Sequence, residues 1–361
     1  MKLKRKIYLL VLLLLLIITS LIAFPEHENV VRVYDNVFYY PLQFVRDIVV
    51  GFIPFSVGDI LYVAAGIWLL ITVILWVKYL LQFKIHKWQL ASSFINTINA
   101  ALIVYLVFML GWGANYYKLP LRTTWQLKSH NDTLELVQFD SLLVDRLNAG
   151  AAVYKPLTLK DINKRSIANY RLFTDSKLKT FGLDVKPTMF YWFMNRLGIE
   201  GYYNPFTGEG QVVGNLPAFL LPFTVSHEMA HQAGIAAEGD ANLLAYALCT
   251  MSVDPSFNYS GNLNLWLYVN ARLYRKDSIV AKRFESQLNK LTLAHIDTIE
   301  QLEELSDNEA HKYSNNVYDG YLKAQQQKDG IRSYGSVTVN AWLLEKKRLR
   351  YPKEYTILKM P

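Results

Sequence analysis

The sequence is poor in cysteine and in charged residues, and it shows neither compositional bias nor an internal repeat. Cys249 is the single cysteine among 361 residues, so no intrachain disulfide can form and the fold depends on burial of apolar surface. Charged residues make up only 19% of the chain and apolar residues 52%, which excludes disordered and fibrous proteins. The composition therefore predicts a folded protein with an unusually apolar part.

Three uncharged runs account for this apolar excess. Ile7–Phe24 is 18 residues long, which as a helix measures about 27 Å, close to the hydrocarbon thickness of a bilayer. We interpret it as an uncleaved anchor rather than a signal peptide, because the apolar run is long and no small-residue cleavage site follows it. Similar runs lie at Ile60–Val77 and at about Ile95–Trp112. The expected transmembrane helices are at about 7–24, 60–81 and 92–114, within an anchor of residues 1–117.

Polar residues near these runs have simple interpretations. Asn96 and Asn99 are three residues apart in the third run, and amides inside a bilayer usually face neighbouring helices. Residues 30–56 are interrupted by charged side chains, so we expect an amphipathic segment at the membrane surface rather than a fourth span. With three spans and no ionisable residue inside them, a transporter is not expected.

The distribution of basic residues predicts the orientation in the membrane. The chain has 38 Lys and Arg against 30 Asp and Glu, a net charge of +8. Much of this surplus flanks the spans, at residues 2–6 and at Lys78, Lys84 and Lys87. The positive-inside rule then places the N-terminus in the cytoplasm and residues 118–361 outside it. Because the surplus lies beside the spans and no stacking motif appears, nucleic-acid binding is not expected.

From Lys118 onward the composition is that of an ordinary globular domain. Helical periodicity predicts helices at Leu136–Tyr154, Asp161–Leu178, Ala241–Ser252, Leu263–Tyr274 and Val280–Leu305. The best strand candidates are Gln211–Val213 and Gly335–Val339. The fold class is therefore mainly α: three N-terminal transmembrane helices, then a mostly helical α+β domain with a small sheet.

The segment His227-Glu228-Met229-Ala230-His231 has the HExxH pattern. Two histidines four apart share one face of a helix and can bind a single Zn²⁺, and the glutamate can act as general base. Ser226 is a candidate N-cap for this helix, and Gly234 is placed to end it in a left-handed turn.

A second helix beginning near Ala237 carries acidic residues close to this motif. Catalytic zinc sites use three protein ligands, and Glu238 is the nearest acid able to be the third; Asp240 or a more distant carboxylate is the alternative. Asn242 and Asp240 are candidates to orient the ligand side chains by hydrogen bonds without binding the metal themselves.

Two further predictions concern substrate binding. Glu209–Val213 is a candidate edge strand against which an extended peptide could pair, and a loop packed on the motif helix is the equal alternative. Tyr334 is a candidate to stabilise the developing oxyanion.

Several segments resemble one bacterial membrane family, catalogued as domain of unknown function 3810. The resemblance rests on residues 202–209 (YYNPFTGE), 227–242 (HEMAHQAGIAAEGDAN), 318–323, 333–335 and 111–117, and it covers nearly the whole chain. It implies a membrane-anchored, zincin-like protein and names no substrate. Glu238–Asn242 is also similar to the element that supplies the third ligand in gluzincins. Metzincins have His or Asp where this chain has Ala237.

These observations predict a zinc-dependent peptidase of the HExxH type in the bacterial inner membrane, with His227, His231 and Glu238 as ligands and Glu228 as general base. Its partners would be a peptide or protein substrate and the lipid bilayer. The alternative is a non-catalytic membrane scaffold or cell-envelope binding protein with a structural or vestigial zinc site. Retention of Glu228 argues against that alternative, because a structural zinc needs no general base.

Overall fold

The computed structural model describes residues 2–24, 28–127, 133–174, 178–306, 309–324 and 334–350. The chain forms two compact units. Unit 1 comprises Met1–Lys118 together with Asn204–Gly208, and unit 2 comprises Leu119–Tyr203 and Glu209–Pro361.

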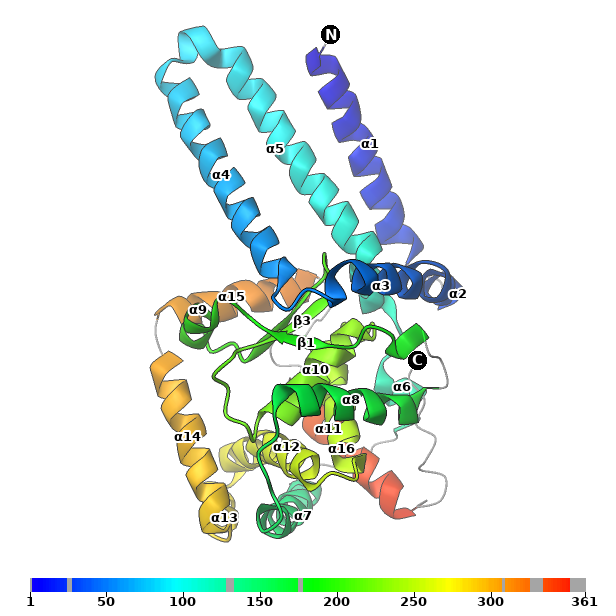
Figure 1. Cartoon of the computed structure of the whole chain (residues 1–361), viewed down its shortest axis with the longest axis vertical. Coiled ribbons are helices and arrows are strands. Elements are labelled where there is room, and N and C mark those ends of the chain that lie inside the picture. The colour runs from blue at the N-terminus through cyan, green and yellow to red at the C-terminus, as the bar shows by residue number, and fades with distance from the viewer. Residues whose placement is uncertain are drawn as a thin grey trace. The chain divides into compact units, whose positions relative to one another are not determined.

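Unit 1 contains three helices that are long and apolar enough to cross a membrane (Figure 1). They are α1 (Lys2–Ala23), α4 (Val57–Leu81) and α5 (Phe83–Gly111). The three apolar spans expected from the sequence are therefore present as helices, and this is a membrane protein. Helix α5 begins about nine residues before the expected start at 92, because the polar segment around Lys84 and Lys87 continues the helix beyond the apolar run.

Polar side chains join the three long helices. The amide of Asn99 in α5 donates to the backbone oxygen of Lys6 in α1 at 3.0 Å, and Lys6 Nζ donates to Ser92 Oγ in α5. Trp76 in α4 donates from its indole nitrogen to Ser93 Oγ in α5 at 3.0 Å. Asn99 is thus an interhelical contact as predicted, whereas the side chain of Asn96 is exposed.

The segment between α1 and α4 is a run of short helical pieces and is not a candidate span. The pieces are α2 (Glu28–Val33), the π-helix η1 (Tyr34–Tyr39), α3 (Tyr40–Arg46) and the π-helix η2 (Asp47–Gly51). Asp35 Oδ1 lies 2.9 Å from Lys118 Nζ and forms an ion pair with it. Lys118 directly follows the 3₁₀ helix η3 (Gly113–Tyr117). Gln43 donates to the backbone oxygen of Gly208 at 2.8 Å, within the short stretch that unit 1 takes from the later chain.

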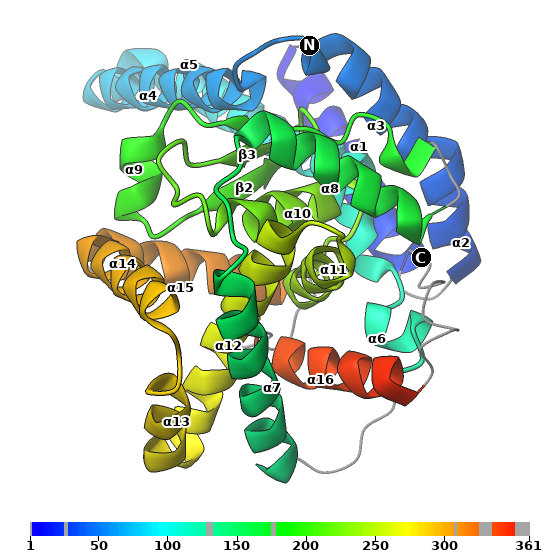
Figure 2. The same ribbon diagram turned by 60° about the horizontal axis from the view of Figure 1, so that its bottom comes forward.

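Unit 2 is mostly helical. Its helices are α6 (Leu121–Thr124), α7 (Thr133–Ala151), α8 (Leu159–Phe173), η4 (Leu178–Thr180), α9 (Tyr191–Arg196), α10 (Leu221–Gln232), α11 (Glu238–Met251), α12 (Pro255–Lys276), α13 (Ser278–Glu285), α14 (Lys290–Ser306), α15 (Glu309–Ala324) and α16 (Tyr334–Arg350). Helices α10 and α11 pack against each other and are surrounded by α8, α12 and α16 (Figure 2). Eleven of the α11 residues are buried, so this helix lies at the centre of the core.

A three-stranded sheet packs on α10. Strands β1 (Val185–Pro187), β2 (Gly201–Asn204) and β3 (Glu209–Val212) are arranged in the order β1-β3-β2. β1 and β3 are parallel, with Val185 opposite Gly210 and Pro187 opposite Val212. β3 is therefore the central strand and all four of its residues are buried, so the expectation of an edge strand at Glu209–Val213 is wrong.

Three further sequence expectations are corrected by the fold. Gly335–Val339 is the first part of α16 and not a strand, because Val337, Ala341 and Leu344 repeat at helical spacing and all are buried. The helix expected at Val280–Leu305 is divided into α13 and α14. Ser226 lies inside α10 rather than at its N-cap, where it donates to the backbone oxygen of Pro222.

Candidate metal centre

Helix α10 carries the HExxH segment through the centre of unit 2. It begins at Leu221 with Pro222 in its first turn, where a missing N–H costs nothing. It ends as predicted near Gly234, whose φ of +83° is left-handed, and the Ile235 N–H bonds back to the Ala230 carbonyl at 3.0 Å. This tight turn returns the chain at once, so that α11 begins at Glu238 beside the end of α10.

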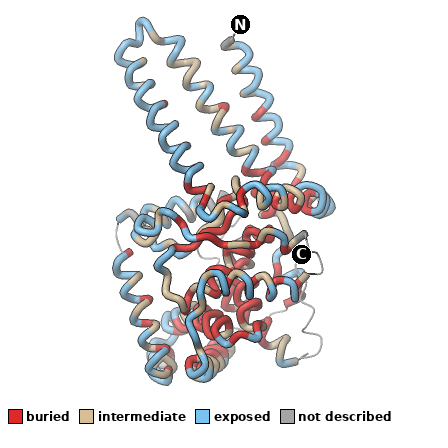
Figure 3. The backbone as a smooth tube through the Cα atoms, viewed as in Figure 1, coloured by how far each residue is buried: buried red, intermediate tan, exposed pale blue. Residues whose placement is uncertain are grey.

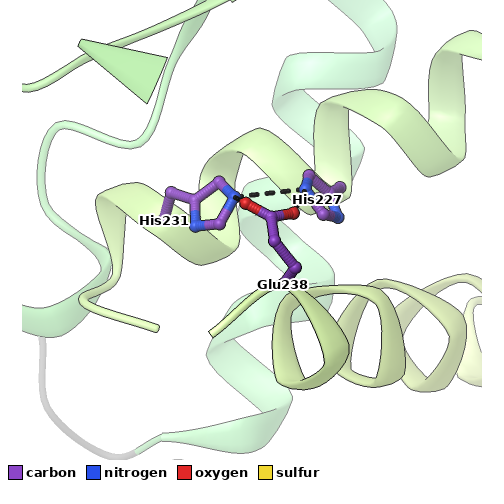
Figure 4. A group of neighbouring side chains, drawn as sticks. All are labelled: His227, His231 and Glu238. Atoms are coloured by element: carbon purple, nitrogen blue, oxygen red, sulfur yellow. Dashed lines mark hydrogen bonds and ion pairs between the residues drawn. The ribbon is translucent and has the colours of Figure 1, made fainter. Parts of the chain in front are cut away.

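The turn brings two imidazoles and one carboxylate together (Figure 4). The two Nε2 atoms of His227 and His231 are 3.1 Å apart. The Glu238 carboxylate lies between them, with Oε2 3.2 Å from His227 Nε2 and Oε1 3.5 Å from His231 Nε2. His231 and Glu238 are buried and His227 is nearly so. Within the described part of the chain, this is the group of His, Cys, Asp and Glu side chains that could hold a metal ion.

The spacing of these atoms fits a tetrahedral metal ion. A zinc ion bound at about 2.0–2.1 Å holds neighbouring ligand atoms about 3.3 Å apart. The three observed separations lie close to that value, and two imidazole nitrogens with one carboxylate form a donor set that suits Zn²⁺. The residues present therefore fit a divalent ion bound through His227, His231 and Glu238.

His231 is oriented by the turn that follows it. Its Nδ1 lies 2.8 Å from the backbone oxygen of Ile235, which can only accept, so the proton is on Nδ1 and Nε2 is directed toward the carboxylate. Burial alone would lower the pKa of His231, but the neighbouring Glu238 and Glu228 carboxylates outweigh it and raise this pKa to about 9. Burial would likewise raise the pKa of Glu238, and the two histidines instead hold it well below the ordinary value.

Glu228 is buried beside the group without being part of it. Burial raises its pKa to about 7, the nearby His227 and His231 oppose this rise, and Glu238 and Glu200 add to it. Its Oε2 atom has no hydrogen-bond partner among the described residues. A carboxylate with a pKa near neutrality and a free oxygen is suited to accept and return a proton.

Two strand glycines make room for Glu228. A Cβ atom at Gly201 in β2 would lie 2.8 Å from Glu228 Oε1 and 2.8 Å from the Gln211 carbonyl oxygen. A Cβ atom at Gly210 in β3 would lie 3.2 Å from Glu228 Cβ. The sheet therefore approaches α10 closely at the general-base candidate because both strands lack a side chain there.

The remaining predicted site residues have different surroundings. Asn242 is buried one turn after Glu238, and its amide nitrogen has no hydrogen-bond partner in the described chain. Asp240 accepts a hydrogen bond from the Leu121 N–H at 3.1 Å, so its carboxylate is engaged at the start of α6. Tyr334 is the first residue of α16, and its side chain lies outside what the structure describes.

Glu200 is a residue near the site that sequence analysis missed. It directly precedes β2, and the Thr224 hydroxyl on α10 lies 3.1 Å from its Oε2 atom. Its charge acts on Glu228, and the charge of His227 acts on it. The sequence offered one weak signal, the adjacent Gly201 within a strand, since glycine there marks a close approach of the backbone.

The fold and the site together define a helical membrane protein with three candidate spans and a His₂Glu group capable of holding a metal ion. The chain belongs to the family described as protein of unknown function (DUF3810), whose model matches residues 34–341. No curated protein and no solved structure matches the chain.

Proposed function

We propose that this protein is a membrane-anchored, zinc-dependent peptidase of the zincin type. The observation that carries the proposal is the convergence of the His227 and His231 nitrogens with the Glu238 carboxylate at separations typical of a tetrahedral ligand set. The glutamate of the HExxH segment lies buried at the same place, which a purely structural metal site would not require.

In the proposed reaction the metal would supply Lewis acidity, which activates water and polarises the substrate carbonyl. Glu228 then accepts a proton on its free carboxylate oxygen and returns it to the leaving amine. Burial raises the pKa of Glu228 above the ordinary glutamate value, which makes its carboxylate a stronger proton acceptor. His231 Nδ1 lies against the Ile235 carbonyl, which directs Nε2 toward Glu238, and Nε2 must release its proton for the ion to bind.

Charge and packing within unit 1 support a protein anchored in the inner membrane of a bacterium. In this orientation the N-terminus lies in the cytoplasm and residues 118–361 lie outside it. Lys6 bonds to Ser92, so the basic start of α1 lies beside the first part of α5. That part of α5 carries Lys84 and Lys87, and Lys78 is in the last turn of α4. The basic residues thus gather at one end of the bundle, as a cytoplasmic end would require.

The decisive experiment combines metal analysis with one isosteric substitution. Purified wild-type protein should contain about one zinc per chain and hydrolyse members of a peptide library. The variant Glu228→Gln should keep its zinc and lose at least about a thousandfold in kcat, because the proton acceptor is gone while the ligands remain. Glu238→Ala is the matched control and should lose zinc as well as activity.

Two outcomes would contradict the proposal. A wild-type protein that holds zinc and cleaves no library peptide would support the non-catalytic scaffold instead. Unchanged hydrolysis by Glu228→Gln would remove Glu228 from the mechanism.

A further inference from the structure

Glu200 differs from the other carboxylates of the site in being open to solvent. Glu228 and Glu238 are buried, whereas Glu200 is an exposed residue whose contact with the Thr224 hydroxyl is partly buried. It nevertheless lies among protein groups, since desolvation raises its pKa and the charge of His227 opposes that rise. Solvent reaches Glu200, and the charge of the candidate ligand His227 acts on it. Glu200 is therefore placed to contact a molecule bound at the metal centre.

The backbone and one hydroxyl hold Glu200 in this position. Its carbonyl oxygen accepts from the Val213 N–H at 2.9 Å, so the residue extends the pairing between β2 and β3. The Thr224 hydroxyl lies 3.1 Å from its Oε2 and 3.2 Å from the backbone oxygen of Leu220. Thr224 precedes His227 by three residues and His231 by seven, so all three share one face of α10. Glu200 is thus attached to the face that carries the metal-ligand candidates.

No lysine or arginine in the described part of the chain pairs with Glu200. Among the described residues, neither Glu200 nor Glu228 forms an ion pair with Lys or Arg, and Glu303 in α14 adds a further negative influence on Glu200. Glu238 is paired with His227 and His231, whereas Glu200 forms no ion pair with a histidine among the described residues. The site therefore retains negative charge at an accessible carboxylate, which favours a cationic partner.

We propose that Glu200 binds an ammonium group of the peptide substrate beside the metal centre. The group is either the free amino terminus or a lysine side chain, and both offer N–H donors to the oxygen that Thr224 leaves free. This inference rests on the proposed peptidase function and assigns its substrate class. Glu200 is in this role a specificity-determining residue, and it is not one of the close metal-ligand group.

The test measures binding as well as turnover, using full-length protein in detergent with zinc. Three labelled hexapeptides serve as probes. The first is hexa-alanine with a free amino terminus, the second is N-acetylated hexa-alanine, and the third is N-acetylated with one central alanine replaced by lysine. Binding is measured by fluorescence anisotropy in the Glu228→Gln background, with and without Glu200→Gln. Glu303→Gln is the matched control, because it removes an exposed acid whose charge also acts on Glu200 but which lies in helix α14.

Glu200→Gln should weaken binding of one amine-bearing peptide by about tenfold or more and that of the acetylated neutral peptide by less than about twofold. Weaker binding of the peptide with a free amino terminus identifies an exopeptidase-like site. Weaker binding of the lysine peptide identifies a pocket for a lysine side chain. Zinc content should remain unchanged.

Equal weakening of all three peptides, an equal effect of Glu303→Gln, or loss of zinc in Glu200→Gln would overturn the assignment. Failure of the proposed function gives a separate result. In that case the wild type cleaves none of these peptides, while the anisotropy measurements still decide whether Glu200 selects an ammonium group.

Discussion

The two units use apolar residues in opposite ways, and Figure 3 shows that the long helices are mostly exposed whereas the centre of unit 2 is buried. In α4, 25 residues long, Gly58, Asp59 and Thr72 are buried while most leucine, isoleucine and valine side chains are exposed. In α11, 14 residues long, nearly every apolar side chain is buried. The first arrangement is stable only where lipid is the solvent, and the second is the normal core of a unit surrounded by water. A run of apolar residues in a helix therefore does not by itself show that the helix is buried in protein; the solvent around the helix must also be known.

The strongest test of this contrast asks which solvent each region meets. Alkaline phosphatase fused after Tyr117 should be active, because three spans would deliver the chain to the extracytoplasmic side, where that enzyme folds. A fusion after Gln82, between α4 and α5, should be inactive and serves as the control. Activity in the reverse pattern would invert the proposed orientation, and activity at neither point would show that the helices do not cross as proposed.

Truncating a leucine should have very different effects in the two regions. Leu248→Ala in α11 removes a side chain that is 1% exposed and should lower the free energy of unfolding of unit 2 by about 2–5 kcal/mol. Leu70→Ala in α4 removes a side chain that is 61% exposed and should leave unit 2 unchanged in denaturant unfolding of the full chain in detergent. Equal losses for both variants would show that α4 contributes to the same core.

A buried carboxyl in unit 2 gives a further test, because its protonation makes the stability of the unit depend on pH. Asp140 in α7 is fully buried and accepts from Trp266 Nε1 at 2.8 Å and Asn270 Nδ2 at 3.2 Å. Burial raises its pKa to about 6, and these two hydrogen bonds oppose the rise. Since the folded state binds this proton more tightly than the unfolded chain, the stabilising contribution is complete below about pH 4 and is lost as pH rises through 6.

The measurement is the difference in unfolding free energy between wild type and Asp140→Asn. From about pH 5 to about pH 7.5 the wild type should lose about 1–2 kcal/mol relative to the variant, which has no proton to release at this position. A difference that stays constant with pH would show that Asp140 does not titrate in this range. Asn99, buried in α5, offers no such dependence because an amide does not ionise.

Much of the candidate site could be predicted from local sequence. His227 and His231 are one helical turn apart, Gly234 supplies the left-handed turn, and Glu238 follows seven residues after His231, so short-range geometry alone brings these side chains together. Glu200 and Gly201 could not be placed in the same way, because their approach to α10 depends on how β2 pairs within the sheet. The expected strand at Gly335–Val339 failed for a related reason: β-branched residues favour strands, but packing of α16 against α11 and α12 overrides that preference.

The amino-acid sequence by itself determined the three apolar helices and the HExxH turn, because both follow from interactions within about one span or a few helical turns. Tertiary structure alone decided that β3 is central in its sheet, that Asp240 holds α6 rather than the metal-ligand candidates, and that Glu200 stands open beside them. These features depend on contacts between residues far apart in the chain, and such contacts form only when the hydrophobic core brings the elements together.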